Sequence, residues 1–196
     1  MNKKLDAKKY WKSFEILAVK VVKIQIKEIV KYEDLKFYED EVPLTRDHGI
    51  DGQLHISLKG NDISITVEAK LRAKGPLGIK EFASSIVNYF INLSDIHFVV
   101  TNVQFSEDAQ NILKSIQVRH EKNCLNYIDG YLINQIAGEI DYTGCDPLQK
   151  RQLKKLVSYI SKENFTEPNF NKHIDQKIKI QKKIGENLYV LPNHVH

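Results

Sequence analysis

Apolar and polar residues alternate most regularly between residues 49 and 70. From Gly52 to Leu58 every second residue is small or apolar, and polar side chains fill the positions between them. A second alternating run covers residues 63–70. Period two is the spacing at which side chains share one face of a β-strand. Between the two runs lies Gly60-Asn61, and its glycine suits the tight turn of a hairpin. The pattern therefore predicts a β-hairpin with one buried face.

The hairpin pattern also predicts which residues lie opposite one another. With the turn at residues 60–61, Asp51 is expected opposite Lys70. The same register places Gln53 opposite Glu68. Asp51, Glu68 and Lys70 then share one face, within roughly 5 to 8 Å of one another. Two carboxylates and an ammonium at that spacing can surround a divalent cation and a phosphate, which indicates metal-assisted phosphodiester chemistry.

Other stretches have the period of helices or the apolar runs of short strands. Helices are expected over residues 7–31, 79–92, 106–118, 131–140 and 146–162. Strands are expected over residues 35–42, 96–100 and 125–128, and a late strand in the tail, where residues 174–184 alternate and residues 188–191 form a second candidate stretch. Trp11 is expected on the packing stripe of the first helix, and Phe90 on that of the second. The mixture of helices and strands predicts an α/β fold.

Glu15 lies on the largely apolar side of the first predicted helix. A carboxylate is costly to bury unless a positive group meets it. Glu15 is therefore expected either at the edge of the core or facing a cation, and the sequence leaves both interpretations open.

A basic loop, residues 71–78, follows the second strand of the hairpin. Loops at strand ends are well placed to contact a ligand, because the rigid strand positions them. Arg72 and Lys74 are expected to contact the phosphate backbone of a nucleic acid.

The length of 196 residues, with 42% hydrophobic residues, predicts one main core rather than two full domains. The net charge of +4 permits an anionic partner. Lysines crowd residues 3–31 and 150–183. These clusters are either a basic flank that holds phosphates or two solvated helix faces.

Several classes of protein are excluded or disfavoured by what the sequence lacks. The two cysteines match neither a disulfide framework nor a zinc site. Charges interrupt the apolar run over residues 16–30, so we expect no signal peptide, no membrane partner and a cytoplasmic location. Glycine-rich nucleotide loops, nucleophile elbows, HExxH and paired CxxC motifs are absent, which excludes P-loop ATPases, serine hydrolases and zinc proteases.

The ordered set Glu15, Asp51 and Glu68-Ala69-Lys70 resembles the PD-(D/E)XK nuclease superfamily, although the proline is missing. Longer segments resemble, in order, the Mrr-type restriction endonuclease catalytic domain; they are residues 49–52, 67–70, 98–102, 105–106, 109 and 127–132. Together they span roughly residues 10 to 140. Many Mrr-type members carry glutamine where this chain has Glu68.

The resemblance implies a restriction-endonuclease-like core, a mixed central sheet flanked by helices, that cleaves DNA with Mg²⁺ or with Mn²⁺ in its place. Asp51, Glu68 and the backbone carbonyl of Ala69 would hold the metal. Glu15 would bind a second ion or hold a water molecule. Lys70 would lie beside the attacking water or the scissile phosphate.

Residues 1–142 are assigned to the nuclease domain, and residues 143–196 to a basic helical extension and tail that lie outside the resemblance. The expected function is a metal-dependent DNA endonuclease of restriction or anti-phage defence. It would act as a homodimer or higher oligomer. One interpretation makes the chain the effector part of a larger protein. The alternatives are a catalytically silent DNA-binding or oligomerisation module, a Holliday-junction resolvase, or a plain hairpin with an ordinary Asp-Lys pair.

Overall fold

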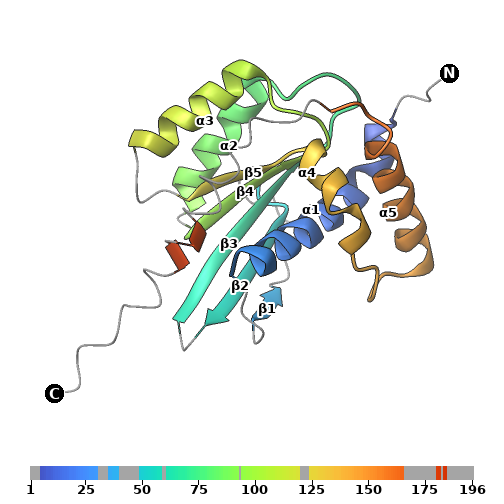
Figure 1. Ribbon diagram of the computed structural model, residues 1–196, viewed down its shortest axis with the longest axis horizontal. Helices are drawn as coiled ribbons and strands as arrows, with labels where there is room; N and C mark the ends of the chain where they lie inside the picture. The colour runs from blue at the N-terminus through green and yellow to red at the C-terminus, as the bar shows by residue number, and fades with distance from the viewer. Residues whose placement is uncertain are drawn as a thin grey trace.

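The computed structural model describes residues 5–30, 35–39, 49–58, 61–92, 94–119, 124–165, 180–181 and 183–184. Within these ranges a five-stranded sheet of order β1-β2-β3-β4-β5 forms the centre (Figure 1). Its strands are β1 (Lys36–Glu39), β2 (Gly52–Leu58), β3 (Asn61–Lys70), β4 (Ile96–Thr101) and β5 (Leu125–Ile128). The helices are α1 (Ala7–Val30), α2 (Ile79–Asn92), α3 (Glu107–Arg119), α4 (Gly130–Gln135), the short 3₁₀ helix η1 (Ala137–Glu139) and α5 (Pro147–Ile160).

The sheet is mixed. Strands β1, β2 and β3 form an antiparallel meander, whereas β4 runs parallel to β3 and β5 runs parallel to β4. Parallel neighbours need a crossover connection, and α2 and α3 provide the two crossovers. The predicted α/β fold with a mixed sheet flanked by helices is therefore confirmed.

The register of the hairpin differs from the predicted one. Leu58 pairs with Asn61, so Asn61 belongs to β3 and the predicted turn at residues 60–61 is wrong. A glycine suits either position of a two-residue turn, and for this reason the sequence pattern alone allowed two registers. The shift moves each partner by two residues, which leaves every side chain on its predicted face. Continuing the observed register beyond β2 brings Asp51 opposite Glu68 instead of Lys70.

The two faces of the sheet are covered by different helices (Figure 1). The larger core joins α1, α4 and α5 to one face of the sheet, and its fully buried members include Phe14, Leu17, Leu54 and Ile65. A second core joins α2 and α3 to the other face, where the rings of Phe82 and Phe105 meet edge to face with centroids 5.4 Å apart. Every residue of β4 is buried, as expected for a parallel strand that is covered on both faces.

Two aromatic residues that were predicted to lie on packing stripes are exposed instead, so the prediction is wrong for both. Trp11 is 39% exposed, because the buried side of α1 begins only at Ser13. Phe90 is 48% exposed. The neighbouring Tyr89 is buried, and successive helix residues point about 100° apart, so Phe90 is turned toward solvent.

Helix α5 packs against α1. The hydroxyl of Ser13 donates to Gln152 Oε1 at 2.9 Å, and the N–H of Leu5 donates to the hydroxyl oxygen of Tyr159 at 3.1 Å. The predicted start of this helix is confirmed, because Asp146 and Gln149 form a reciprocal capping box and Pro147 follows the cap. The predicted division at residue 142 stays a prediction, although α5 and α1 share one core.

The remaining expectations are met in part. The strand predicted over residues 35–42 is formed by residues 36–39, and residues 40–42 lie outside the described residues. The helix predicted over 131–140 is α4 followed by η1. The late strand stays a prediction: in the first of its two candidate stretches residues 180–181 and 183–184 are helical, and residues 188–191 lie outside the described residues. Among the described helices, none has the length and apolarity needed to cross a membrane.

Asp129 is the N-cap of α4 and is only 4% exposed. Its carboxylate accepts the N–H of Leu132 at 3.1 Å. Burial raises the pKa of Asp129 to about 6, against the opposing effect of the backbone N–H groups of Leu132 and Tyr131. The folded protein therefore binds this proton more tightly than the unfolded chain does.

We expect the contribution of Asp129 to the free energy of unfolding to fall as the pH rises from about 4 to about 6, where the buried carboxyl loses its proton. Asparagine caps a helix equally well without charge. Asp129→Asn should therefore match the parent near pH 4 and exceed its unfolding free energy above pH 6, by up to about 3 kcal/mol. Denaturant titrations at several pH values measure this difference, and a difference that does not change with pH would contradict it.

Candidate functional site

Asp51 lies directly before β2, at the end of the sheet where β3 finishes. Two hydrogen bonds tie it to β3. Its N–H donates to the carbonyl of Val67 at 2.8 Å, and its Oδ2 accepts the N–H of Ala69 at 2.7 Å. The backbone of β3 therefore fixes the position of this carboxylate.

The two glycines flanking Asp51 allow this arrangement. Gly49 has φ of +81°, and a Cβ there would lie 2.4 Å from Asn88 Nδ2. At Gly52 a Cβ would lie 2.4 Å from Cγ2 of Val19 on α1. The first glycine permits a left-handed turn beside α2, and the second lets α1 approach the strand. A glycine is thus favoured for a steric reason at each end of the Gly-Ile-Asp-Gly sequence.

Glu68 and Lys70 lie on β3, on the same face as Asp51. The Glu68 side chain is 1% exposed, and its Oε1 is in contact with Lys70 Nζ. Helix α2 adds two polar neighbours: Asn88 Nδ2 donates to Glu68 Oε1 at 3.4 Å, and Lys70 Nζ lies 3.5 Å from Ser84 Oγ. Because the Lys70 side chain is 23% exposed, its ammonium can be reached from solvent.

His97 and Asn88 are neighbours of Glu68 that the sequence did not predict. His97 is fully buried on β4, with Nε2 3.6 Å from Glu68 Oε2 and Nδ1 2.7 Å from Thr66 Oγ1. Within the described part of the chain, Glu68 Oε2 accepts no hydrogen bond. The available signal was the single polar residue inside the apolar run 96–100. No comparable signal distinguishes Asn88 from other polar residues of α2.

The two carboxylates differ in their electrostatics. Burial raises the pKa of Asp51 to about 6, and the negative charges of Glu15 and Glu68 add to the rise, against the Ala69 N–H and the charge of Lys70. Burial would also raise the pKa of Glu68, but His97 and Lys70 outweigh it and hold that pKa below its usual range. Glu68 therefore has a counter-ion, whereas the charged form of Asp51 is left poorly compensated.

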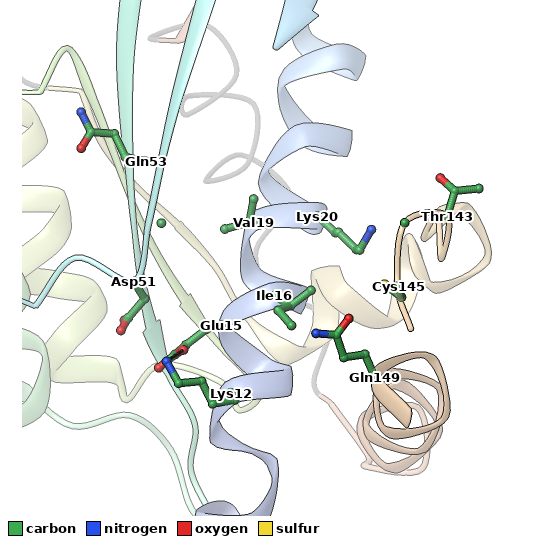
Figure 2. Close-up of a pocket in the computed structure, with 12 residues that line it drawn as sticks. Lys12, Glu15, Ile16, Val19, Lys20, Asp51, Gln53, Thr143, Cys145 and Gln149 are labelled. Carbon is green, nitrogen blue, oxygen red and sulfur yellow. Dashed lines mark ion pairs between the residues drawn. The ribbon is translucent and has the colours of Figure 1, made fainter. Parts of the chain in front are cut away.

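Glu15 lies on α1, with its side chain 16% exposed and 3.2 Å from Lys12 Nζ. It shares with Asp51 a groove of about 480 Å³ between α1, the start of β2 and residues 143–149. Figure 2 shows Lys12 and Glu15 on α1 beside Asp51. Glu15 is thus paired with a lysine near the edge of the core and also contributes to the electrostatics of Asp51, which combines features of both interpretations from the sequence.

Arg72 and Lys74 follow β3 in the basic loop. Asn102 anchors this loop, because its side chain accepts the Arg72 N–H at 2.7 Å and donates to the Arg72 carbonyl at 2.8 Å. The Arg72 guanidinium is ion-paired with Glu81 on α2. Lys74 is exposed, and both cations border a second groove of about 640 Å³.

The donor set suits a hard divalent cation. Among the described residues, no three His, Cys, Asp or Glu side chains gather into a ready-made metal cluster. Asp51 and Glu68 nevertheless offer two carboxylates, and Mg²⁺ needs few protein ligands because it keeps several waters. The raised pKa of Asp51 is a feature that a bound cation would relieve.

Comparison with solved structures identifies the fold. The chain is similar to the MspJI restriction endonuclease, solved in complex with a 27-mer oligonucleotide, with a TM-score of 0.51 and 18% sequence identity over 85% of this chain. The chain has a restriction-endonuclease-like fold. It spans 37% of the length of the MspJI chain.

Other comparisons add little to that result. A protein of unknown function, AF1548, is also similar, with a TM-score of 0.39 and 12% identity over 91% of this chain and 97% of that one, and this likeness is too weak to support an inference. No family model and no curated protein matches the sequence. The similarity of this chain to known proteins is therefore a similarity of fold.

The unequal electrostatics predict opposite effects of two isosteric substitutions in the metal-free protein near pH 7.5. Asp51→Asn should raise the free energy of unfolding by about 1–2 kcal/mol, because it removes a poorly compensated charge and keeps an acceptor for Ala69. Glu68→Gln should lower it by about 1–3 kcal/mol, because it leaves Lys70 without its counter-ion. Denaturant unfolding in EDTA measures both, and changes of the same sign would contradict this account.

Proposed function

We propose that this protein is a divalent-metal-dependent DNA endonuclease. The observation that supports it most is the grouping of Asp51, Glu68 and Lys70 on one face at the end of β3, in a restriction-endonuclease-like fold. Hydrolysis of a phosphodiester needs a cation beside the phosphate and fixed positive charge where negative charge develops. The site offers ligands for the first and a lysine for the second.

Asp51 and Glu68 would hold Mg²⁺, or Mn²⁺ in its place, together with the backbone carbonyl of Ala69. When bound, such a cation lowers the pKa of water and neutralises charge on the phosphate. The chain prepares the ligands for this role. The Ala69 N–H orients Asp51, while Asn88 and Lys70 hold one oxygen of Glu68 and leave the other toward His97.

Lys70 would act on the substrate itself. Its ammonium is positioned by Glu68 and Ser84 and remains partly exposed. A positive charge fixed beforehand stabilises a phosphorane-like transition state without reorganising during the reaction. Glu15, across the groove from β2, would bind a second ion or orient a water. Arg72 and Lys74 would contact the phosphate backbone beyond the cleaved bond.

A role in restriction or anti-phage defence, in the cytoplasm, follows from this proposal and from the Mrr-type resemblance of the sequence. One such centre cuts one strand, so a double-strand break requires two centres related by symmetry. We therefore propose a homodimer or a higher oligomer. The chain would work alone or beside a further sensor or effector domain.

Cleavage of supercoiled plasmid tests the proposed activity. The parent protein should nick or linearise plasmid with Mg²⁺ and not in EDTA. Lys70→Ala should slow single-turnover cleavage by about 100- to 1000-fold, the range seen when one group that stabilises transition-state charge is removed. Lys36→Ala is the matched control, because Lys36 is an exposed lysine on β1.

The outcomes separate the alternatives. A folded parent that binds duplex DNA but never cuts it would be a silent binding module. Cutting confined to branched DNA would make the protein a junction resolvase. Equal rates for Lys70→Ala and Lys36→Ala would mean that the site is misplaced. Sedimentation velocity of the same samples tests the oligomer, which a strict monomer that linearises plasmid in one step would refute.

Glu15→Gln distinguishes a ligand from a structural ion pair. If Glu15 contributes charge to the site, the substitution should slow cleavage by roughly ten-fold or more per folded molecule. The Lys12–Glu15 pair lies at the surface of a helix, so its loss should change the unfolding free energy by no more than about 0.5 kcal/mol. Thermal melts and single-turnover rates measure the two effects. Unchanged cleavage with a clear loss of stability would remove Glu15 from the site.

A further inference from the structure

Helix α5 has a strongly cationic side that the proposed cleavage site does not use. Its opposite side is buried in the main core through Leu153, Leu156, Val157 and Ile160. The exposed side forms a shallow hollow of about 640 Å³, which also includes Ser158 and Tyr159. We call this surface the α5 basic face; its cationic residues are Lys150, Arg151, Lys154, Lys155 and Lys162.

No negative charge of the described residues pairs with the α5 basic face. Among the residues that the structure describes, no carboxylate forms an ion pair with any of its five cations, and none lines the hollow. The lysine-rich side of α1 differs, because Glu28, Glu139 and Asp141 line the same groove as Lys20, Lys23 and Lys27. Like charges four residues apart destabilise a helix, so the α5 basic face favours a partner that supplies negative charge.

The position of α5 connects this surface to the candidate site. At its N-terminal end, Gln149 borders the groove that contains Glu15 and Asp51 (Figure 2). Near its C-terminal end, Tyr159 and the following Glu163 border the groove that contains Arg72 and Lys74. Helix α5 therefore extends between the two grooves in which the proposed nuclease would meet its substrate.

We propose that the α5 basic face binds the phosphate backbone of duplex DNA beside the cleavage site; this inference rests on the proposed function. The 14 residues of α5 extend over about 21 Å. Duplex DNA carries about one negative charge per 1.7 Å of its axis, so a helix of this length faces several phosphates. Contacts of this kind hold and orient the duplex, but they do not distinguish one base sequence from another.

The test is the salt dependence of duplex binding, measured without divalent metal so that no cleavage occurs. Each lost phosphate contact lowers the slope of log K against log salt by about 0.9. The double variant Lys150→Gln, Lys155→Gln should therefore bind a fluorescent duplex more weakly, with a slope about 1–2 units smaller than that of the parent.

Two controls separate a local contact from net charge. Lys27→Gln, Lys36→Gln removes the same number of exposed lysines from the last turn of α1 and from β1. It should leave the slope within about 0.5 unit of the parent value. Lys150→Arg, Lys155→Arg keeps the charge and should restore the parent slope. Circular dichroism of all three variants checks that α5 remains helical.

The inference is overturned if the α5 double variant and the control double variant have equal slopes. It is also overturned if the parent binds RNA or anionic lipid vesicles but not duplex DNA. Failure of the proposed function gives a different result. A parent that binds duplex with the expected α5 dependence, yet never cuts plasmid in Mg²⁺, refutes the nuclease and leaves the α5 basic face as a DNA-binding surface.

Discussion

Strand β3 contains the Glu68 carboxylate, the Lys70 ammonium and the Thr66 hydroxyl, and it belongs to a sheet that helices cover on both faces. Charges in such a place are tolerated only when other groups compensate them. Lys70 and Asn88 compensate Glu68, and His97 completes a chain of contacts that continues to Thr66 and Ser94. The positions of α2 and β4 beside β3 are therefore part of the site as much as they are part of the fold.

The same compensation does not extend to Asp51. This residue is held by backbone hydrogen bonds, which fix its position but supply no full positive charge. Two acids that lie opposite each other at the same end of the hairpin thus differ in the metal-free protein: Glu68 contributes to stability through Lys70, whereas the charge of Asp51 is left poorly compensated. In the proposed function, a bound cation would supply the positive charge that Asp51 lacks.

Sequence reasoning succeeded where the signal was local. The alternation along β2 and β3, the apolar run of β4 and the Asp146-Pro147 start of α5 depend on neighbouring residues, and each predicted an element that the structure contains. The face of the hairpin on which each side chain lies was also predictable, because a change of register by two residues leaves every side chain on the same face. The exact pairing was not, since a single glycine suits either turn position.

Partners contributed by distant segments were beyond the sequence pattern. His97 is separated by 31 residues from Thr66, to which it is hydrogen-bonded, and Asn88 reaches Glu68 from a separate helix. Their roles depend on the parallel pairing of β4 with β3, which no local period specifies. The packing of α5 on α1 was hidden for the same reason, because it joins residues near the two ends of the described chain.

Gly52 shows that a residue without a reactive side chain can be sterically constrained, because it lies where α1 approaches the strand. The Cγ2 atom of Val19 would lie 2.4 Å from any Cβ at this position, and valine side chains are stiff. In a survey of random substitutions, positions 51 and 52 would therefore respond to change in different ways. Changes at 51 would give folded protein with an altered site, whereas changes at 52 would displace α1 and carry Glu15 away from its neighbour. The pattern of tolerated substitutions would then identify the position where α1 approaches the strand, as well as the position of the Asp51 carboxylate.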